Sequence, residues 1–334
     1  MGRRPKKVSI TKIAQEAGVS VATVSRAINH RANVSEDTRK KINELLKKYN
    51  FLPTPAVPRE KKIALLTGSS RLTEYTSEVF NGIYQYTEEN ALATTIIFSK
   101  ENSRYSLIEQ VREQQCSGVV VILPATFSEE LDSLAESDLP VVLIDEAVYR
   151  KGLGFIDHDS YSGSKNAVEH LLKLGHQKIA YLKCNTQTLN HIQRFKAYEN
   201  TLAEAGVKTQ PAWVQEIEPE SHPYLSGYNA ALKLLKNAPE ITAIMTTNDD
   251  IAIGAMKAIQ EKGIRIPEDI SIIGFDNYCQ SDYVSPELTT VNHPIEEAGF
   301  LAAKSIDEFL KNPQGAKLPQ EILPTKLIVR NSTA

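Results

Sequence analysis

The chain of 334 residues is 41% hydrophobic and 24% charged, with a formal net charge of −3 and three widely separated cysteines. This composition is typical of a globular protein of two or three domains, and it excludes a disulfide-rich framework. No apolar run approaches the roughly 18 residues of a membrane helix, and no apolar segment follows the charged start "MGRRPKK". We therefore expect a cytoplasmic protein with neither a secretory signal nor a membrane span.

The charge is distributed unevenly along the chain. Residues 1–60 contain 13 Lys and Arg against 5 Asp and Glu, whereas the remainder is acidic. A basic segment on an acidic body favours a polyanionic partner for that segment alone. From charge alone, a solvated basic face without a partner is the alternative.

The segment "SITKIAQEAGVSVATVSRAIN" predicts two short helices joined by a tight turn. Gly18 suits the left-handed residue that ends the first helix, and Ser20 suits the N-cap of the second. A third helix is predicted after Ser35, in "VSEDTRKKINELLKKYNFLP". The residues of the second helix that are expected to be buried are Val24, Ala27 and Ile28.

Three short helices with this turn indicate a helix-turn-helix, whose second helix enters the major groove of DNA. Arg26 can donate two hydrogen bonds to guanine, and Val21 and Ala22 offer small apolar contacts. The short polar side chains suit phosphates. The predicted DNA-contacting residues are Ser20, Val21, Ala22, Thr23, Ser25, Arg26 and Asn29. A small three-helix bundle that does not bind nucleic acid is the alternative.

The stretch "NFLPTPAVPREKKIALL" places Pro53, Pro55 and Pro58 between the basic segment and an apolar strand. Prolines lack a backbone donor and push the preceding residue toward extended conformations. This composition predicts an extended, semi-rigid linker over residues 53–62. The head then comprises residues 1–52 and the body residues 63–334.

In the body, apolar runs rich in β-branched residues alternate with helical patterns. The predicted strands are "KIALLTG", "TTIIFSK", "GVVVILP", "PVVLID", "KIAYLKC", "WVQEIE", "AIMTTN" and "SIIGFD". The predicted helices lie near residues 76–91, 104–115, 128–136, 160–174, 190–205, 224–236 and 250–262. Such alternation indicates an α/β fold of two doubly wound lobes with parallel sheets. We expect a ligand at the carboxyl ends of the strands, in the cleft between the lobes.

Polar residues follow several of these strands, and each has two interpretations. Asp145, Asn248 and Asp276 come directly after apolar runs, where they can contact a ligand or cap the next helix. Asp249 in particular is expected to be a helix cap.

Sequence motifs for catalysis are absent. The first strand is not followed by a phosphate-binding glycine motif, and neither GxSxG nor HExxH occurs. The seven histidines show no metal-ligand spacing. We therefore expect no enzymatic activity, no cofactor and no metal site.

"KIAQEAGVSVATVSRAIN" and "VSEDTRKKI" resemble the DNA-binding head of the lactose-repressor-like (LacI/GalR) family of bacterial regulators. "LLKLGHQKIAYL", "TTNDDIAIGAMKAIQEKGIRIPEDISIIGFDN" and "PELTTVNHP" extend the resemblance over the body. It implies the fold of periplasmic sugar-binding proteins, crossed three times between the lobes, and a homodimer formed through the bodies. On that pattern the N-lobe is residues 63–159 and 292–322, and the C-lobe is residues 160–291 and 323–334.

The resemblance also implies an effector site. Arg194 falls where the family places an arginine that binds hydroxyls, and Tyr75 where many members stack an aromatic ring on the ligand. The other implied positions are Asp145, His222, Asn248, Asp276 and His293. The histidines at two positions and the loop "SSRLTEY", which carries Arg71, depart from the family pattern. These departures are compatible with a charged or modified sugar.

We therefore predict a ligand-responsive repressor of carbohydrate-utilisation genes that binds double-stranded operator DNA as a dimer. A nucleobase or nucleoside effector, or control by a partner protein, is the alternative within this class. A solute-binding protein for uptake fits poorly, because the DNA-binding head is present and no signal peptide is recognised. An enzyme is the third class.

Overall fold

The computed structural model describes residues 10–28, 34–49, 61–68, 72–99, 105–122, 130–185, 188–218 and 222–334. It divides the chain into two compact units, Met1–Glu60 and Lys61–Ala334. The predicted linker lies outside the described residues up to position 60, and Lys62 is already the first residue of a strand.

The described residues of the head form three helices, α1 (Ile10–Ala17), α2 (Val21–Ile28) and α3 (Glu36–Lys48). Gly18 has a φ of 73° in the turn after α1, as its predicted capping role requires. Ser20 and Ser35 each accept a hydrogen bond from the backbone three residues later, at the starts of α2 and α3. The head core consists of Ile13, Ala14, Ala17, Val24, Ala27, Ile42 and Leu46. The side chain of Ile28 lies outside the described part.

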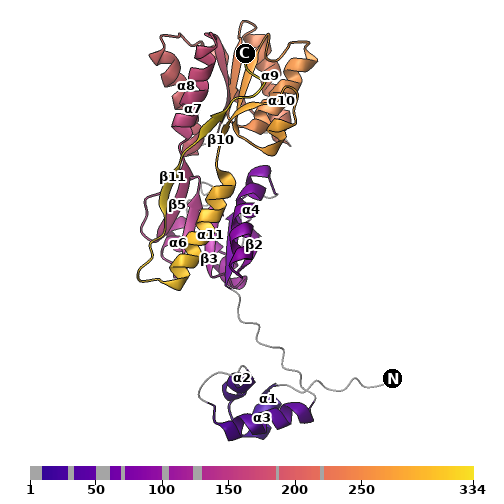
Figure 1. Ribbon diagram of the computed structural model, residues 1–334, viewed down its shortest axis with the longest axis vertical. Helices are drawn as coiled ribbons and strands as arrows, with labels where there is room; N and C mark the ends of the chain where they lie inside the picture. Colours follow the sequence, from indigo (N-terminus) through magenta and orange to yellow (C-terminus); the bar gives the residue numbers. More distant parts are fainter. Residues whose placement is uncertain are drawn as a thin grey trace, which may run out of the picture. The chain divides into compact units, whose positions relative to one another are not determined.

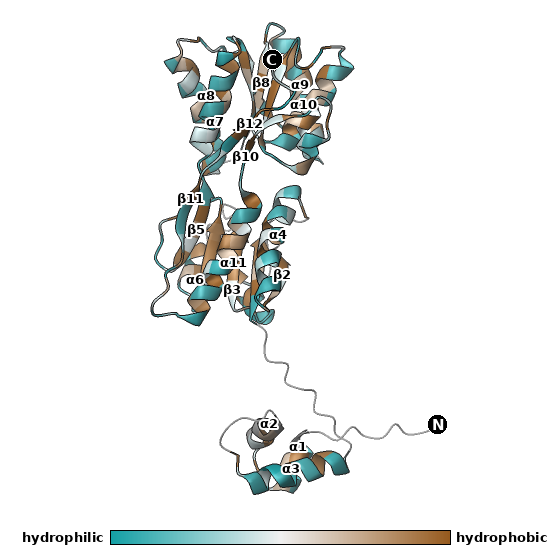
Figure 2. Cartoon of the chain, viewed as in Figure 1, coloured by the Kyte–Doolittle hydropathy of each residue, from teal (hydrophilic) through white to brown (hydrophobic). Residues whose placement is uncertain are grey.

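The first sheet of the body has six strands, all parallel, in the order β11-β5-β4-β3-β1-β2 (Figure 1). Their bounds are β1 (Lys62–Thr67), β2 (Ala93–Phe98), β3 (Gly118–Ile122), β4 (Val141–Ile144), β5 (Leu153–His158) and β11 (Gln320–Leu323). One face packs against α4 (Glu74–Glu89) and α11 (Ile295–Lys311), and the other against α5 (Leu107–Glu113) and α6 (Leu131–Ala135). The continuous apolar character of β1, β3 and β4 follows from burial on both faces (Figure 2).

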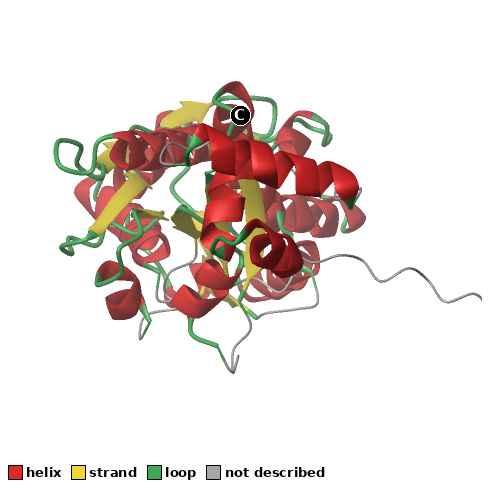
Figure 3. Cartoon of the chain, turned by 90° about the horizontal axis from the view of Figure 1, so that it is seen from below, coloured by secondary structure: helices red, strands yellow, loops and turns green. Residues whose placement is uncertain are grey.

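The second sheet has the order β12-β10-β9-β8-β6-β7, with β12 antiparallel at its edge. Its strands are β6 (Ile179–Cys184), β7 (Val214–Ile217), β8 (Ala243–Thr246), β9 (Ser271–Asp276), β10 (Thr289–Asn292) and β12 (Lys326–Ile328). The flanking helices are α7 (Ser160–Lys173) and α8 (Leu189–Glu204) on one face, and α9 (Pro223–Asn237) and α10 (Asp249–Glu261) on the other. Figure 3 shows the helices of the chain in red and its strands in yellow. The predicted fold class, a helix-turn-helix followed in the chain by two doubly wound α/β lobes, is confirmed.

The chain passes between the sheets three times, after β5, after β10 and between β11 and β12 (Figure 1). Four strands were not predicted, namely β5, β10, β11 and β12. β11 and β12 are short and contain no fully buried residue, so they lack a clear apolar signal. β5 contains a glycine and ends in Asp157 and His158. Among the described helices, none is both long and apolar enough to cross a membrane.

A close contact between α4 and α11 positions two residues of the cleft. A Cβ atom at Gly82 would lie 1.9 Å from the backbone oxygen of Glu296, and one at Gly299 would lie 2.2 Å from that of Val79. Glycine is therefore needed for this approach of the two helices. Tyr75 in the first turn of α4 is thereby held near His293, just before α11, with ring centroids 6.2 Å apart.

Candidate functional site

A cavity of about 290 Å³ lies between the two lobes at the carboxyl ends of their strands. This is the location expected for a ligand in doubly wound folds. The lining residues are Thr73, Tyr75, Asp145, Glu146, Thr188, Asn190, His191, Arg194, Pro223, Asn248, Asp250, Asp276, Tyr278 and His293. Both lobes contribute to it, because Asp145 follows β4 of the first sheet and Asp276 ends β9 of the second.

The structure brings together six of the seven residues predicted to bind a ligand. These are Tyr75, Asp145, Arg194, Asn248, Asp276 and His293. His222 is exposed and lines a separate groove on α9 and α10, with its ring 4.8 Å from that of Tyr224. Arg71 lies outside the described residues.

Arg194 lines the cavity and links the two lobes. The residue is only 4% exposed, and its guanidinium donates to the backbone oxygen of Thr247 at 2.7 Å and to His158 Nε2 at 3.1 Å. It also lies 3.5 Å from Asp276 and stacks over the ring of Phe275. Because arginine is always a donor, His158 Nε2 must be an acceptor, and the proton of this neutral imidazole is on Nδ1.

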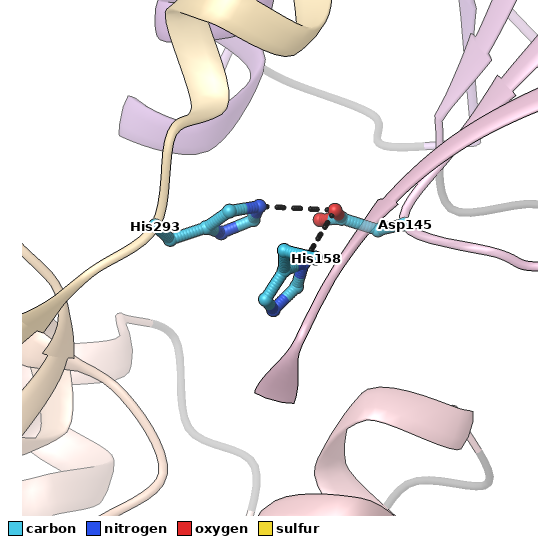
Figure 4. A group of neighbouring side chains, drawn as sticks. All are labelled: Asp145, His158 and His293. Carbon is cyan, nitrogen blue, oxygen red and sulfur yellow. Dashed lines mark hydrogen bonds and ion pairs between the residues drawn. The ribbon is translucent and has the colours of Figure 1, made fainter. Parts of the chain in front are cut away.

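Figure 4 shows that His158 and His293 both point to Asp145. His158 Nδ1 and His293 Nε2 lie 2.9 and 3.0 Å from the same carboxylate oxygen. Burial would raise the pKa of Asp145, but the two imidazoles outweigh it and hold that pKa well below its usual range. Burial and the neighbouring His293 lower the pKa of His158, in agreement with its neutral tautomer.

His293 lies between carboxylates of the two lobes, because its Nδ1 is 3.5 Å from Asp276 while its Nε2 faces Asp145. Burial opposes a charge there, but Asp145 and then Asp276 raise the pKa of His293 to about 9. At neutral pH it is an imidazolium that connects the two carboxylates. The sequence alone did not indicate this cluster, because the spacing of the histidines shows no pattern.

Asp145, His158 and His293 are residue types that bind metal ions, and the relevant atoms lie within 4.8 Å of one another. The ring orientation argues against a shared ion. The two imidazoles are stacked, with centroids 3.6 Å apart and planes 29° apart, whereas the nitrogen lone pairs lie in the ring planes. An ion in the plane of one ring would be far out of the plane of the other. The arrangement suits two donors to one carboxylate better than three ligands to one metal.

The predicted cap at Asp249 is wrong. Asn248 is the N-cap of α10 and accepts from the backbone N–H of Ile251. Asp249 is fully buried and accepts from the backbone N–H of Tyr278 and from Ser281 Oγ. Burial, and then Asp276, raise the pKa of Asp249 to about 8, so this residue is a neutral acid that holds the loop after β9.

Several lining residues were not predicted, including Glu146, Asn190, His191, Asp250 and Tyr278. Helical spacing could have identified Asn190, which lies four residues before Arg194 on α8 and so on the same face. Asp250 lies in the first turn of α10, where the helix dipole stabilises any carboxylate. Nothing else in the sequence indicates that Asp250 lines a cavity.

Part of the predicted DNA-contacting surface is described. Val21 is 43% exposed at the start of α2. The hydroxyls of Ser20 and Thr23 are hydrogen bonded to each other at 2.9 Å. The side chains of Ala22, Ser25 and Arg26, and the whole of Asn29, lie outside the described part.

Comparison with known proteins gives matches over both units. The family model for bacterial regulatory proteins of the lacI family matches residues 9–54, and that for a periplasmic binding protein-like domain matches residues 168–333. The HTH-type transcriptional repressor PurR of Mannheimia succiniciproducens is 30% identical, over 97% of this chain and 98% of its own length.

Solved structures match at similar coverage. The lac repressor dimer bound to operator and the anti-inducer ONPF has a TM-score of 0.71 and 25% identity, over 98% of this chain and 99% of that one. A LacI family transcriptional regulator from Enterococcus faecium with bound ribose has a TM-score of 0.71 and 25% identity, over 82% and 99%. These matches over nearly the whole length confirm the predicted resemblance. The chain therefore belongs to the lacI family of bacterial regulatory proteins, which are ligand-responsive regulators of transcription.

Proposed function

We propose that the chain is a cytoplasmic repressor that binds a pseudo-palindromic operator through its heads and a sugar-like effector in the cavity between its lobes. The observation that carries this proposal is a cavity of buried polar side chains contributed by both lobes, in the same chain as a helix-turn-helix. A ligand there contacts both lobes at once, so its binding free energy depends on how they are arranged.

The cavity fits a small polyhydroxylated ring. Asp276 and Asn248 offer groups for hydroxyls, and the rings of Tyr75 and Tyr278 offer apolar faces. Ribose bound to the Enterococcus relative supports a sugar as the effector class. A nucleobase is the second candidate, because its ring N–H groups would meet the same carboxylates. The effector is bound without reaction, and release of a product from it would contradict this proposal.

We propose that the effector acts on the head through the linker. Rearrangement of the lobes moves β1, whose first residue is Lys62. The proline-rich residues 53–61 then act as an extended spacer that sets the separation of the two heads. Coupling of this kind is typically about 1–3 kcal/mol, or roughly 5- to 150-fold in operator affinity. A helical linker with a side chain intercalated into a kinked operator would contradict the spacer.

We propose a homodimer, with the groove on α9 and α10 as part of its interface. The groove has a volume of about 580 Å³ and is lined mainly by apolar groups, including Leu225, which is 42% exposed. Tyr283 is 86% exposed in the segment whose Ser285 oxygen accepts a hydrogen bond from Gln260 of α10. A second copy would cover these side chains. Light scattering should give a dimer for the full chain and a monomer for Leu225→Glu, whereas a dimeric Leu225→Glu would place the interface elsewhere.

Footprinting should show a protected palindrome with its half-sites about one helical turn, roughly 34 Å, apart. Arg26→Ala should relax the preference at one base pair in each half-site, by about 1–3 kcal/mol. Lys12→Ala should weaken binding to all sequences evenly and reduce its salt dependence. A footprint without a protected palindrome would contradict operator binding by the heads. An Arg26→Ala variant that loses affinity equally for all sequences would contradict the role of Arg26.

A further inference from the structure

The cavity contains more negative than positive charge. Four carboxylates line it, those of Asp145, Glu146, Asp250 and Asp276. Among the described lining residues, the cations are Arg194 and His293. His191 is neutral at neutral pH, because burial, and then Arg194, lower its pKa to about 4.

Both cations are already engaged. The guanidinium of Arg194 donates to Thr247 and His158 and lies beside Asp276. The charge of His293 lies between Asp145 and Asp276, although its Nδ1, 3.5 Å from Asp276, makes no hydrogen bond. The positive charge of the cavity is therefore matched to these two carboxylates.

Asp250 and Glu146 have no ion-pair partner among the described residues. Asp250 faces the hydroxyl of Tyr224 and the like charge of Asp276, and burial followed by that charge raises its pKa to about 6. Burial, and then Asp157, raise the pKa of Glu146. A carboxylate in such surroundings gains much when a cation arrives, because the local dielectric constant is low.

Asn190 supplies an independent sign of a ligand that donates hydrogen bonds. The residue is 5% exposed and lines the cavity, and its amide nitrogen donates to the backbone oxygen of Asp145 and to Asp157 Oδ1. Both partners only accept, so the orientation of the amide is fixed. Its Oδ1 is buried without a hydrogen-bond partner. A buried acceptor without a partner is costly, and a donor on the ligand would remove that cost.

We infer that the effector is a polyhydroxylated amine of amino-sugar type, with its ammonium bound by Asp250 and a neighbouring hydroxyl donating to Asn190. This inference rests on the proposed function, since it names the ligand of the same cavity. An ammonium has three donors and no acceptor, so it complements the Asp250 carboxylate. The hydroxyls of such a ligand both donate and accept, so they can also pair with Asn190 Oδ1, the Tyr75 hydroxyl and His293 Nδ1, which are buried without hydrogen-bond partners. Anionic effectors such as sugar phosphates are disfavoured, because no unengaged cation lines the described part of the cavity.

Matched ligands distinguish the contribution of the amine to the affinity from that of the sugar ring. Calorimetry on the full-length protein would compare glucosamine, galactosamine and mannosamine with the parent hexoses and with the N-acetylated forms, with adenine and hypoxanthine as nucleobases. We expect one amine to bind roughly tenfold or more tightly than both its parent and its N-acetyl form, the gain typical of a charged hydrogen bond.

Substitution tests the assigned partner. Asp250→Asn should abolish the preference for the amine over its parent, while Asp250→Glu should retain part of it. Asp138→Asn, an exposed carboxylate outside the cavity, is the control and should change nothing. The thermal melt and operator affinity of each free variant show whether it has folded.

The outcomes distinguish this inference from the proposed function. Tighter binding of a parent sugar, an N-acetyl form or a nucleobase, or binding of none of the amines, overturns the inference. A preference for the amine that persists in Asp250→Asn overturns the role of Asp250. The proposed function fails separately, when no palindrome is protected or when a ligand that binds the cavity leaves operator affinity unchanged.

Discussion

Arg194→Met is expected to destabilise the body by about 3–5 kcal/mol and to abolish effector binding, because it leaves buried charge and acceptors without their partner. The residue is 4% exposed, and removal of its guanidinium leaves the backbone oxygen of Thr247 without that donor and Asp276 without that cation. Urea unfolding of the body measures the first effect, and calorimetry measures the second. Operator binding by the effector-free protein should be largely retained where the variant is folded, since the head is a separate compact unit.

Two further variants test the cause. Lys233→Met removes an exposed cation that pairs with Glu218 on the surface, and it should change the unfolding free energy far less than Arg194→Met does. Arg194→Lys keeps the charge but not the planar fork, so it should recover only part of the loss. A cost for Arg194→Met as small as that for Lys233→Met would show that the buried interactions contribute little to stability.

The stability of the body is expected to fall as the pH rises through about 9, because His293 then loses its proton. Its folded pKa of about 9 lies above the ordinary value of 6.5. The resulting stabilisation is therefore fully present below about pH 6.5 and is lost as the pH rises through 9. The shift corresponds to roughly 3 kcal/mol. Chemical unfolding of the wild type and of His293→Gln between pH 6 and pH 10 measures it.

In that experiment the difference in unfolding free energy between wild type and His293→Gln should shrink as the pH rises. Asp249, with a folded pKa of about 8, also lowers stability with rising pH, but it is present in both proteins and cancels in the difference. The control is His170→Gln, outside the cavity. Burial lowers the pKa of His170, so the difference of this variant from wild type should not change between pH 7 and pH 10. A difference for His293→Gln that is independent of pH would contradict the imidazolium between the lobes.

The sequence by itself determined the helix-turn-helix and the class of the body. Gly18 and Ser20 act within one turn of chain, and the apolar runs of β1, β3, β4 and β9 are continuous because both faces of each strand are buried. These signals are local, so no knowledge of distant contacts is needed to recognise them. The position of Asp145 and Asp276 at the ends of strands was visible for the same reason.

Only the tertiary structure decided which role each polar residue has. The crossing segment after β10 brings His293 into contact with His158 and Asp145. The spacing of these residues in the sequence does not predict this contact. The cap of α10 is Asn248 and not Asp249, because Asp249 accepts hydrogen bonds from the loop after β9. In the sequence, an aspartate that caps a helix cannot be told from one that is a buried neutral acid or one that binds a ligand. The order of strands and the lobe crossings decide which atoms face each carboxylate, and those atoms set its charge and its function.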